Sequence, residues 1–299
     1  MTYSVIKKLS NVLISASSRC NTKYTAGLLL CAAISSSSAF ASNYIADTTS
    51  DDASETMIIP IEREFLPAEN ESDKQIRKLL QHAPELEIIA QLNNDVIHFD
   101  QAVTIQFGSQ DGPLYDPQLR EIQVPYQFWS DAVKLFSTQY EKNEKQAIYK
   151  ASMDSLLHTL LHEIGHAYID IYNIPVLGRE EDAADNFASV ILLHHVENGD
   201  DIALHAAQLF ALEDAQIEQF DNLDFIDEHS LDIQRYFYTL CLIYGSNPDK
   251  HKMLFKEIDQ QYKVEKEDIC QDEFERIHEN WSLYLEQNQI DDEADSAKP

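Results

Sequence analysis

The sequence predicts an α+β fold in which a small antiparallel sheet leads into a mainly helical body. Two observations predict it. Between residues 103 and 124 the apolar residues form short strand-like runs, whereas from about Tyr126 to Glu286 they recur at helical spacing. The chain has 299 residues, of which 44% are hydrophobic, and this is enough for a packed core of ordinary size.

The strands are expected at Val103–Phe107 and Glu121–Val124, separated by a turn-rich segment from Gly108 to Pro117. A short amphipathic stretch precedes them at Lys74–Gln81. In the helical part, three segments interrupt the periodicity and predict helix ends. They are residues 173–178, 198–200 and 245–248.

Four regions are expected along the chain. Residues 1–41 have basic residues, a short apolar stretch and Ala39-Phe40-Ala41, which is typical of a signal peptide cleaved after Ala41. Residues 42–56 are expected to form a flexible acidic leader, residues 57–286 a single domain, and residues 287–299 an acidic tail. The apolar stretch at residues 26–34 is too short for a stable membrane anchor.

The composition limits the partners of the protein. The chain carries 52 Asp and Glu against 22 Lys and Arg, a formal net charge of −30. A nucleic-acid partner is therefore not expected, since binding to phosphates needs an excess of basic residues on one face.

The cysteines predict one disulfide. Cleavage after Ala41 would remove Cys20 and Cys31 and leave Cys241 and Cys270 in an exported chain. An even pair in an oxidising compartment is more often a disulfide than a metal site.

The segment His162-Glu163-Ile164-Gly165-His166 has the pattern HExxH. On a helix, positions i and i+4 lie on one face, so the rings of His162 and His166 can converge on one Zn²⁺ with Glu163 beside them as general base. His158 continues this stripe one turn earlier, but such a histidine more often packs or forms a hydrogen bond than binds the metal.

A second helix is expected to complete the site. Glu181 and Asp185 share a face of the segment that follows the break at residues 173–178. We expect Glu181 to be the third zinc ligand and Asp185 to accept a hydrogen bond from a ligand histidine. Glu180 is the competing ligand, but it faces about 100° away from Asp185. A metzincin site is excluded because Ile169 and Tyr172 stand where glycine and histidine are required.

The stretch HEIGHAYIDIYNIPVLGREEDAADNFA resembles the active-site region of a bacterial family of secreted proteins of unknown function, classed as candidate metallopeptidases with a gluzincin-type signature. The resemblance covers most of the chain after residue 41, and implies a zincin-like fold with His162, His166 and Glu181 on zinc and Glu163 as base. Pro125 and Gln127 depart from the family pattern. The other similar segments are PLYDP, the strand at Ile122 with Tyr126, residues 229–248, Cys270 and Trp281.

These residues imply metal-assisted hydrolysis of a peptide bond by a zinc-activated water. A further donor is needed for the oxyanion, and His229 is the candidate we favour over Arg235, Tyr236 and Tyr238. The strand at residues 120–124 is the expected pairing partner for an extended substrate.

The leading functional prediction is therefore an exported zinc metallopeptidase, periplasmic or secreted, that acts on a peptide or protein substrate. Two alternatives remain open at this stage. The same site could hydrolyse another amide, such as a cell-wall crosslink, or the chain could be a catalytically silent scaffold that binds zinc or a protein. The sequence does not fix the oligomeric state.

Overall fold

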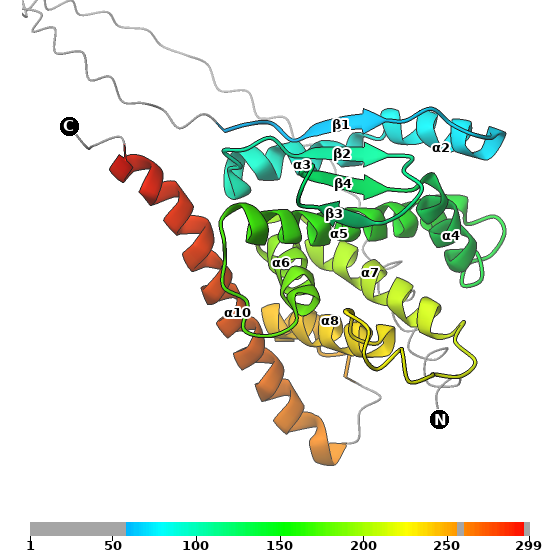
Figure 1. Cartoon of the computed structure of the whole chain (residues 1–299). Coiled ribbons are helices and arrows are strands. Elements are labelled where there is room, and N and C mark those ends of the chain that lie inside the picture. Colours follow the sequence, from blue (N-terminus) through cyan, green and yellow to red (C-terminus); the bar gives the residue numbers. More distant parts are fainter. Residues whose placement is uncertain (1–57, 256–259, 296–299) are drawn as a thin grey trace, which may run out of the picture.

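The computed structural model describes residues 58–255 and 260–295, and this part of the chain has an α+β fold with a small sheet and a mainly helical body (Figure 1). The α+β prediction is confirmed. The expected signal peptide and acidic leader, residues 1–56, lie outside the described residues. At the other end, where we expected an acidic tail from residue 287, the helical backbone continues to Asp295.

The strands and two short helices come first along the chain, and the helical body follows. The strands are β1 (Glu62–Phe65), β2 (Thr104–Phe107), β3 (Leu114–Asp116) and β4 (Glu121–Val124). Between β1 and β2 lie α2 (Glu71–Gln81), a 3₁₀ turn (Pro84–Leu86), α3 (Glu87–Leu92) and a π-helical turn (Asn93–Ile97). The body comprises α4 (Tyr126–Phe136), α5 (Lys145–Ile171), α6 (Glu180–His195), α7 (Gly199–Asp214), α8 (Asp232–Ser246), α9 (Pro248–His251) and α10 (Gln260–Asp295).

The sheet is mixed, so the prediction of an antiparallel sheet is wrong. The strand order is β1-β2-β4-β3, with β1–β2 and β2–β4 parallel and only β3–β4 antiparallel. After β2 the chain passes to the outer edge of the sheet, forms β3 within the segment expected to be a turn, and returns as β4. Because β3 reverses the chain direction, β2 and β4 run parallel.

Helix α5 is the centre of the fold. It packs against β3 and β4 on one side and against α4, α6 and α7 on others, and the HExxH motif lies in its second half (Figure 1). Leu160, Leu161 and Ile164 around the motif are fully buried. The motif is therefore held on a rigid helix within the core.

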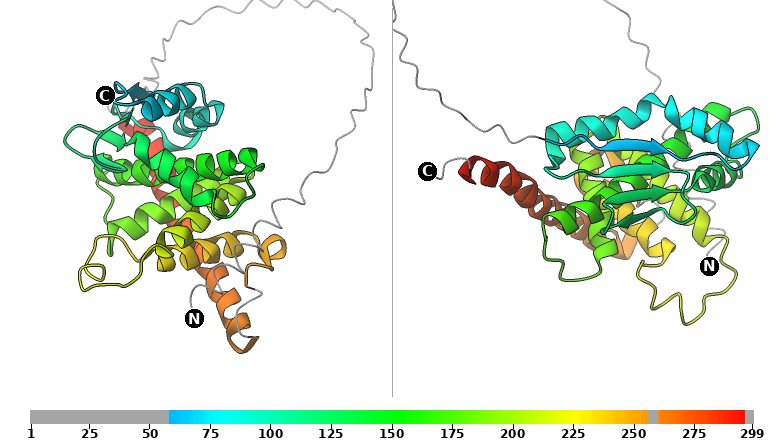
Figure 2. Two further views of the ribbon diagram at one scale, coloured as in Figure 1. Left: turned by 90° about the vertical axis from the view of Figure 1, so that its right-hand side faces the viewer. Right: turned by 45° about the horizontal axis from the view of Figure 1, so that its top comes forward.

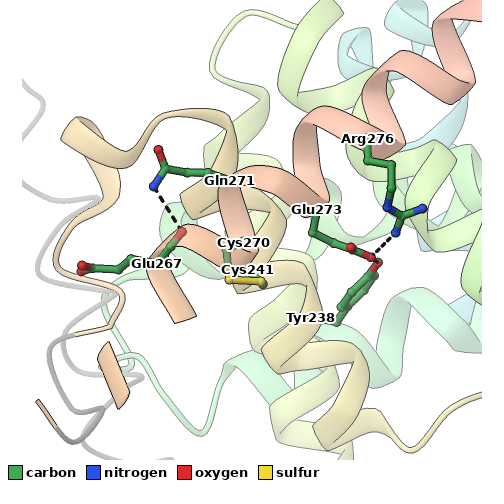
Figure 3. Close-up of a disulfide and its surroundings, with 7 residues drawn as sticks. All are labelled: Tyr238, Cys241, Glu267, Cys270, Gln271, Glu273 and Arg276. Atoms are coloured by element: carbon green, nitrogen blue, oxygen red, sulfur yellow. Dashed lines mark hydrogen bonds and ion pairs between the residues drawn. A yellow bond between two sulfur atoms is a disulfide. The ribbon is translucent and has the colours of Figure 1, made fainter. Parts of the chain in front are cut away.

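A disulfide joins the helical body to its last helix. Cys241 on α8 and Cys270 on α10 form the predicted bond, which confirms that pairing (Figure 3). Beside it, Tyr238 and Arg276 both donate hydrogen bonds to Glu273. Figure 2 shows α10 running along the helical body, where it packs against α8 and α6. Among the described residues, no helix has the length and apolar character needed to cross a membrane.

Candidate metal centre

A cleft of about 430 Å³ opens between β3, α5 and the start of α6. Three histidines and five carboxylates line it, without a lysine or arginine. The lining residues are Pro113, Leu114, Tyr115, Pro117, His162, Glu163, His166, Asp170, Glu180, Glu181, Glu228 and His229.

Helix α5 supplies the HExxH side chains. No proline interrupts its 27 residues, so His162 and His166, four positions apart, lie on the same face of the helix. The Nε2 atoms of His162 and His166 lie 3.2 Å apart. Glu163 is buried at 5% exposure, and this burial raises the pKa of its carboxyl above the ordinary value.

Helix α6 approaches α5 closely at Gly165. A Cβ atom on Gly165 would lie only 3.2 Å from the Cα of Ala184, so a side chain here would push the helices apart. The close approach brings Glu181, in the first turn of α6, to the two histidines. Its Oε2 lies 3.1 Å from His162 Nε2 and 3.3 Å from His166 Nε2.

Carboxylates on the far side of each ring orient the histidines. His162 Nδ1 donates to Asp185 Oδ1 at 2.8 Å, and His166 Nδ1 lies 2.8 Å from Glu180 Oε1. Arg235 donates through Nε and Nη2 to both oxygens of Asp185, each at 2.8 Å. Burial alone would raise the pKa of Asp185, but Arg235 and His162 hold it well below the ordinary value. Glu180, the rival ligand of the sequence analysis, thus lies on the Nδ1 side of His166.

The three converging atoms fit a cation. Because each Nδ1 faces a carboxylate, neutral rings of His162 and His166 would present their Nε2 lone pairs toward each other and toward the Glu181 carboxylate. Two lone pairs and a carboxylate oxygen separated by 3.1 to 3.3 Å need a proton or a metal cation between them. Tetrahedral zinc with ligand distances of about 2.0 to 2.1 Å sets its donor atoms about 3.3 Å apart. The donor set and its spacing therefore suit zinc.

His229 is the one oxyanion candidate of the four that lines the cleft. Its Nε2 lies 2.8 Å from Glu181 Oε2. The other three face elsewhere: Arg235 binds Asp185, Tyr236 is buried in the core, and Tyr238 binds Glu273. The sequence did not indicate that His229 would contact Glu181, because a separation of 48 positions along the chain does not predict a distance in space.

His158 does not join the cluster formed by His162, Glu163, His166, Glu181 and His229. It is 2% exposed, and its ring packs edge-on against Phe210 with 5.7 Å between the centroids. Burial lowers the pKa of this imidazole to about 4.

The strand expected to pair with substrate is internal. β4 has β2 on one side and β3 on the other, so the prediction for residues 120–124 is wrong. β3 is the edge strand that lines the cleft, and within the described residues it pairs with β4 alone. Its Tyr115 donates to Asp170 Oδ2 at 3.0 Å across the cleft wall, a contact that the sequence analysis missed because it treated this segment as a turn.

Comparison with known protein families identifies the family of the chain. A family model with the description "Putative metallopeptidase" matches residues 65–285, which is well over half of the chain and includes every residue of the cluster. No curated protein and no solved structure matches the chain significantly.

Proposed function

Because the chain belongs to this family of "putative metallopeptidases", we propose that it is an exported, zinc-dependent peptidase of the gluzincin type with a zincin-like fold. The observation that carries the proposal is the convergence of His162, His166 and Glu181 within 3.1 to 3.3 Å, beside the buried carboxyl of Glu163. Two histidines and one glutamate, with an oriented carboxylate behind each histidine, are typical of a catalytic zinc site.

The proposed chemistry is hydrolysis of a peptide bond. When bound, zinc would polarise the scissile carbonyl and lower the pKa of water. Glu163 takes a proton from the attacking water and returns it to the leaving amine, and its raised pKa suits both transfers. His229 lies where its Nε2 can donate to the developing oxyanion. Asp185 and Glu180 keep the rings of the ligand histidines in one orientation.

The substrate would be a peptide or protein segment in extended conformation. The outer edge of β3 carries backbone groups that have no strand partner in the described part of the chain, and β3 lines the cleft. Such an edge can form backbone hydrogen bonds with an extended substrate and so hold its scissile bond beside the metal site.

Export to the periplasm or the medium belongs to the same proposal. It rests on the signal-peptide pattern at residues 1–41 and is supported by the disulfide, because such bonds persist in oxidising compartments. The strongly acidic composition argues against a nucleic-acid partner.

Metal analysis of the purified protein tests the proposal. We expect one zinc per chain, no binding in a Glu181→Ala variant, and binding weakened by about 10- to 100-fold in the control Glu180→Gln, which alters only an orienting contact. Absence of zinc in the wild-type protein, before and after incubation with Zn²⁺, would refute the metal site.

Turnover is tested with Glu163→Gln on a peptide library. The variant should retain zinc and lose roughly 10²- to 10⁴-fold in rate, as expected for loss of a general base. If the zinc-loaded wild-type protein cleaves isolated cell wall and no peptide, the substrate is another amide and not a peptide. Failure on both would favour the silent scaffold.

A further inference from the structure

Three histidines of the cleft share one arrangement. Each has a carboxylate on the Nδ1 side of its ring and points its Nε2 atom at the same oxygen, Glu181 Oε2. The Nδ1 contacts are His162–Asp185 at 2.8 Å, His166–Glu180 at 2.8 Å and His229–Asp227 at 3.6 Å, and the Nε2 distances to Glu181 Oε2 are 3.1, 3.3 and 2.8 Å in the same order.

This arrangement distinguishes His229 from an ordinary histidine at the rim of a cleft. An imidazole with a carboxylate on one nitrogen is held with its other lone pair toward a metal. The contact to Asp227 is in ion-pair range and is longer than a hydrogen bond, so His229 is less tightly fixed than the other two rings. Its ligand atom and those of His162 and Glu181 all lie within 4.8 Å of one another.

We propose that His229 is a fourth, displaceable protein ligand of the metal in the resting protein. This inference rests on the proposed metal site and goes beyond it, because the expected site has three protein ligands. With a metal bound, His162, His166, Glu181 and His229 would supply four protein donors, the number found in a structural zinc site, and no position would remain for water or substrate. Hydrolysis would then require His229 to leave.

The fourth ligand differs from the others in how it is anchored. His162 and His166 stand on α5 with side chains 5% and 11% exposed, whereas the His229 side chain is 39% exposed. It belongs to residues 215–231, the connection between α7 and α8, which contains no helix or strand.

Two hydrogen bonds tie this connection to the start of α6. Arg179, which immediately precedes the helix, donates to the backbone carbonyl of His229 at 2.8 Å, and the hydroxyl of Ser230 donates to Asp182 at 2.8 Å. Neither bond involves the imidazole, so the ring can rotate away from Glu181 while the backbone stays in place.

Activity alone cannot test this role, because loss of an oxyanion donor and loss of a ligand would both slow turnover. Metal affinity and coordination separate them. We would compare the wild-type protein, His229→Ala and the control His82→Ala, an exposed histidine whose recorded contact is the Lys78 carbonyl. Each protein is titrated with Zn²⁺ against a chromophoric chelator, and the zinc-bound forms are examined by X-ray absorption.

We expect His229→Ala to bind Zn²⁺ at least about tenfold more weakly and to show two coordinated imidazoles where the wild-type protein shows three. Co²⁺-loaded protein should change its visible spectrum in the same variant, and His82→Ala should match the wild type throughout. The melting curve of the metal-free variant checks that it folds, and His229→Gln repeats the test with a side chain of similar length.

Two results have different meanings. Equal zinc affinity and an equal imidazole count in wild type and His229→Ala would overturn the fourth ligand and leave the three-ligand site intact. A wild-type protein that binds no zinc would overturn the proposed function itself.

Discussion

Replacing Asp185 with asparagine removes the negative charge between His162 and Arg235. The side chains of Asp185 and Arg235 are only 11% and 14% exposed, so the guanidinium would lose its buried counterion. Its other ion-pair partner, Asp232, lies 3.8 Å from Nη1, beyond hydrogen-bond distance. Breaking a buried pair in this way costs about 3 to 5 kcal/mol of unfolding free energy. For a domain of this size, that corresponds to a melting temperature lower by roughly 6 to 20 °C.

A double-mutant cycle measures the interaction. The proteins are Asp185→Asn, Arg235→Met and the double variant, unfolded with urea in the presence of EDTA so that metal binding does not contribute. Methionine keeps an apolar stem over the ring of Phe210, on which Arg235 packs at 4.0 Å. The double variant should be destabilised by less than the sum of the two single variants, by at least about 1 kcal/mol, because it leaves neither charge alone.

The same variants test the coupling to the metal. Asp185→Asn should bind zinc about 10- to 100-fold more weakly, because His162 loses the partner of its Nδ1. The control is Asp182→Ala on the same helix, which removes the acceptor of the hydrogen bond from Ser230 and should cost about 1 kcal/mol. Additive effects in the cycle, or unchanged zinc affinity in Asp185→Asn, would refute the reasoning.

Three further predictions concern other parts of the molecule. Cys241→Ser with Cys270→Ser should lower the unfolding free energy by about 3.5 kcal/mol in urea, since a 29-residue connection loses its crosslink, and an unchanged midpoint would contradict this. Burial and a neighbouring carboxylate raise the pKa of Glu213 from its ordinary value of 4.5 to about 7. The folded state therefore binds the proton of the Glu213 carboxyl more tightly than the unfolded state does. The resulting gain in unfolding free energy is fully present below about pH 4.5 and is lost as the pH rises through 7. In Glu213→Gln the unfolding free energy should no longer fall over this pH range, as measured by urea midpoints at pH 5 and pH 8. An identical pH dependence in the wild type and the variant would disprove the prediction. Gly165→Ala should change the unfolding free energy little, because the higher helix propensity of alanine is offset by overpacking of its Cβ against Ala184 at 3.2 Å. The variant should bind zinc more weakly in a chelator titration, because α6 carries Glu181. Equal zinc affinity would show that the close approach of α6 to α5 is not needed for the site.

Local periodicity predicted part of the helical body. The helix of the HExxH segment and the break at residues 173–178 are confirmed, because helix spacing and helix ends depend on neighbouring residues. The break expected at residues 198–200 lies at residues 196–198, and the breaks at residues 137–144 and 215–231 were not predicted. The spacing of Glu181 and Asp185 likewise follows from one helix. Their distances to α5 depend on Gly165, whose role becomes visible only when two helices are packed.

The sheet was harder to predict because its order depends on long-range pairing. β1 was missed since Glu62, Arg63 and Glu64 are exposed and charged, so the strand has no apolar alternation. The direction of β4 could not be read from its residues, because Ile105 and Ile122 would face the same core in either orientation. The contact of His229 with Glu181 could not be predicted for the same reason. It depends on how residues 215–231, which have no regular secondary structure, pack against α6.

Helix α8 carries two of the contacts described above within about two turns of one another. Near its start, Arg235 holds the carboxylate that orients a histidine of the cleft, and six residues later Cys241 is bonded to α10. A shift of α8 relative to α10 would therefore move Arg235 and, with it, the carboxylate of Asp185. The disulfide limits that shift, so oxidation of the two cysteines favours the arrangement in which Asp185 holds the ring of His162.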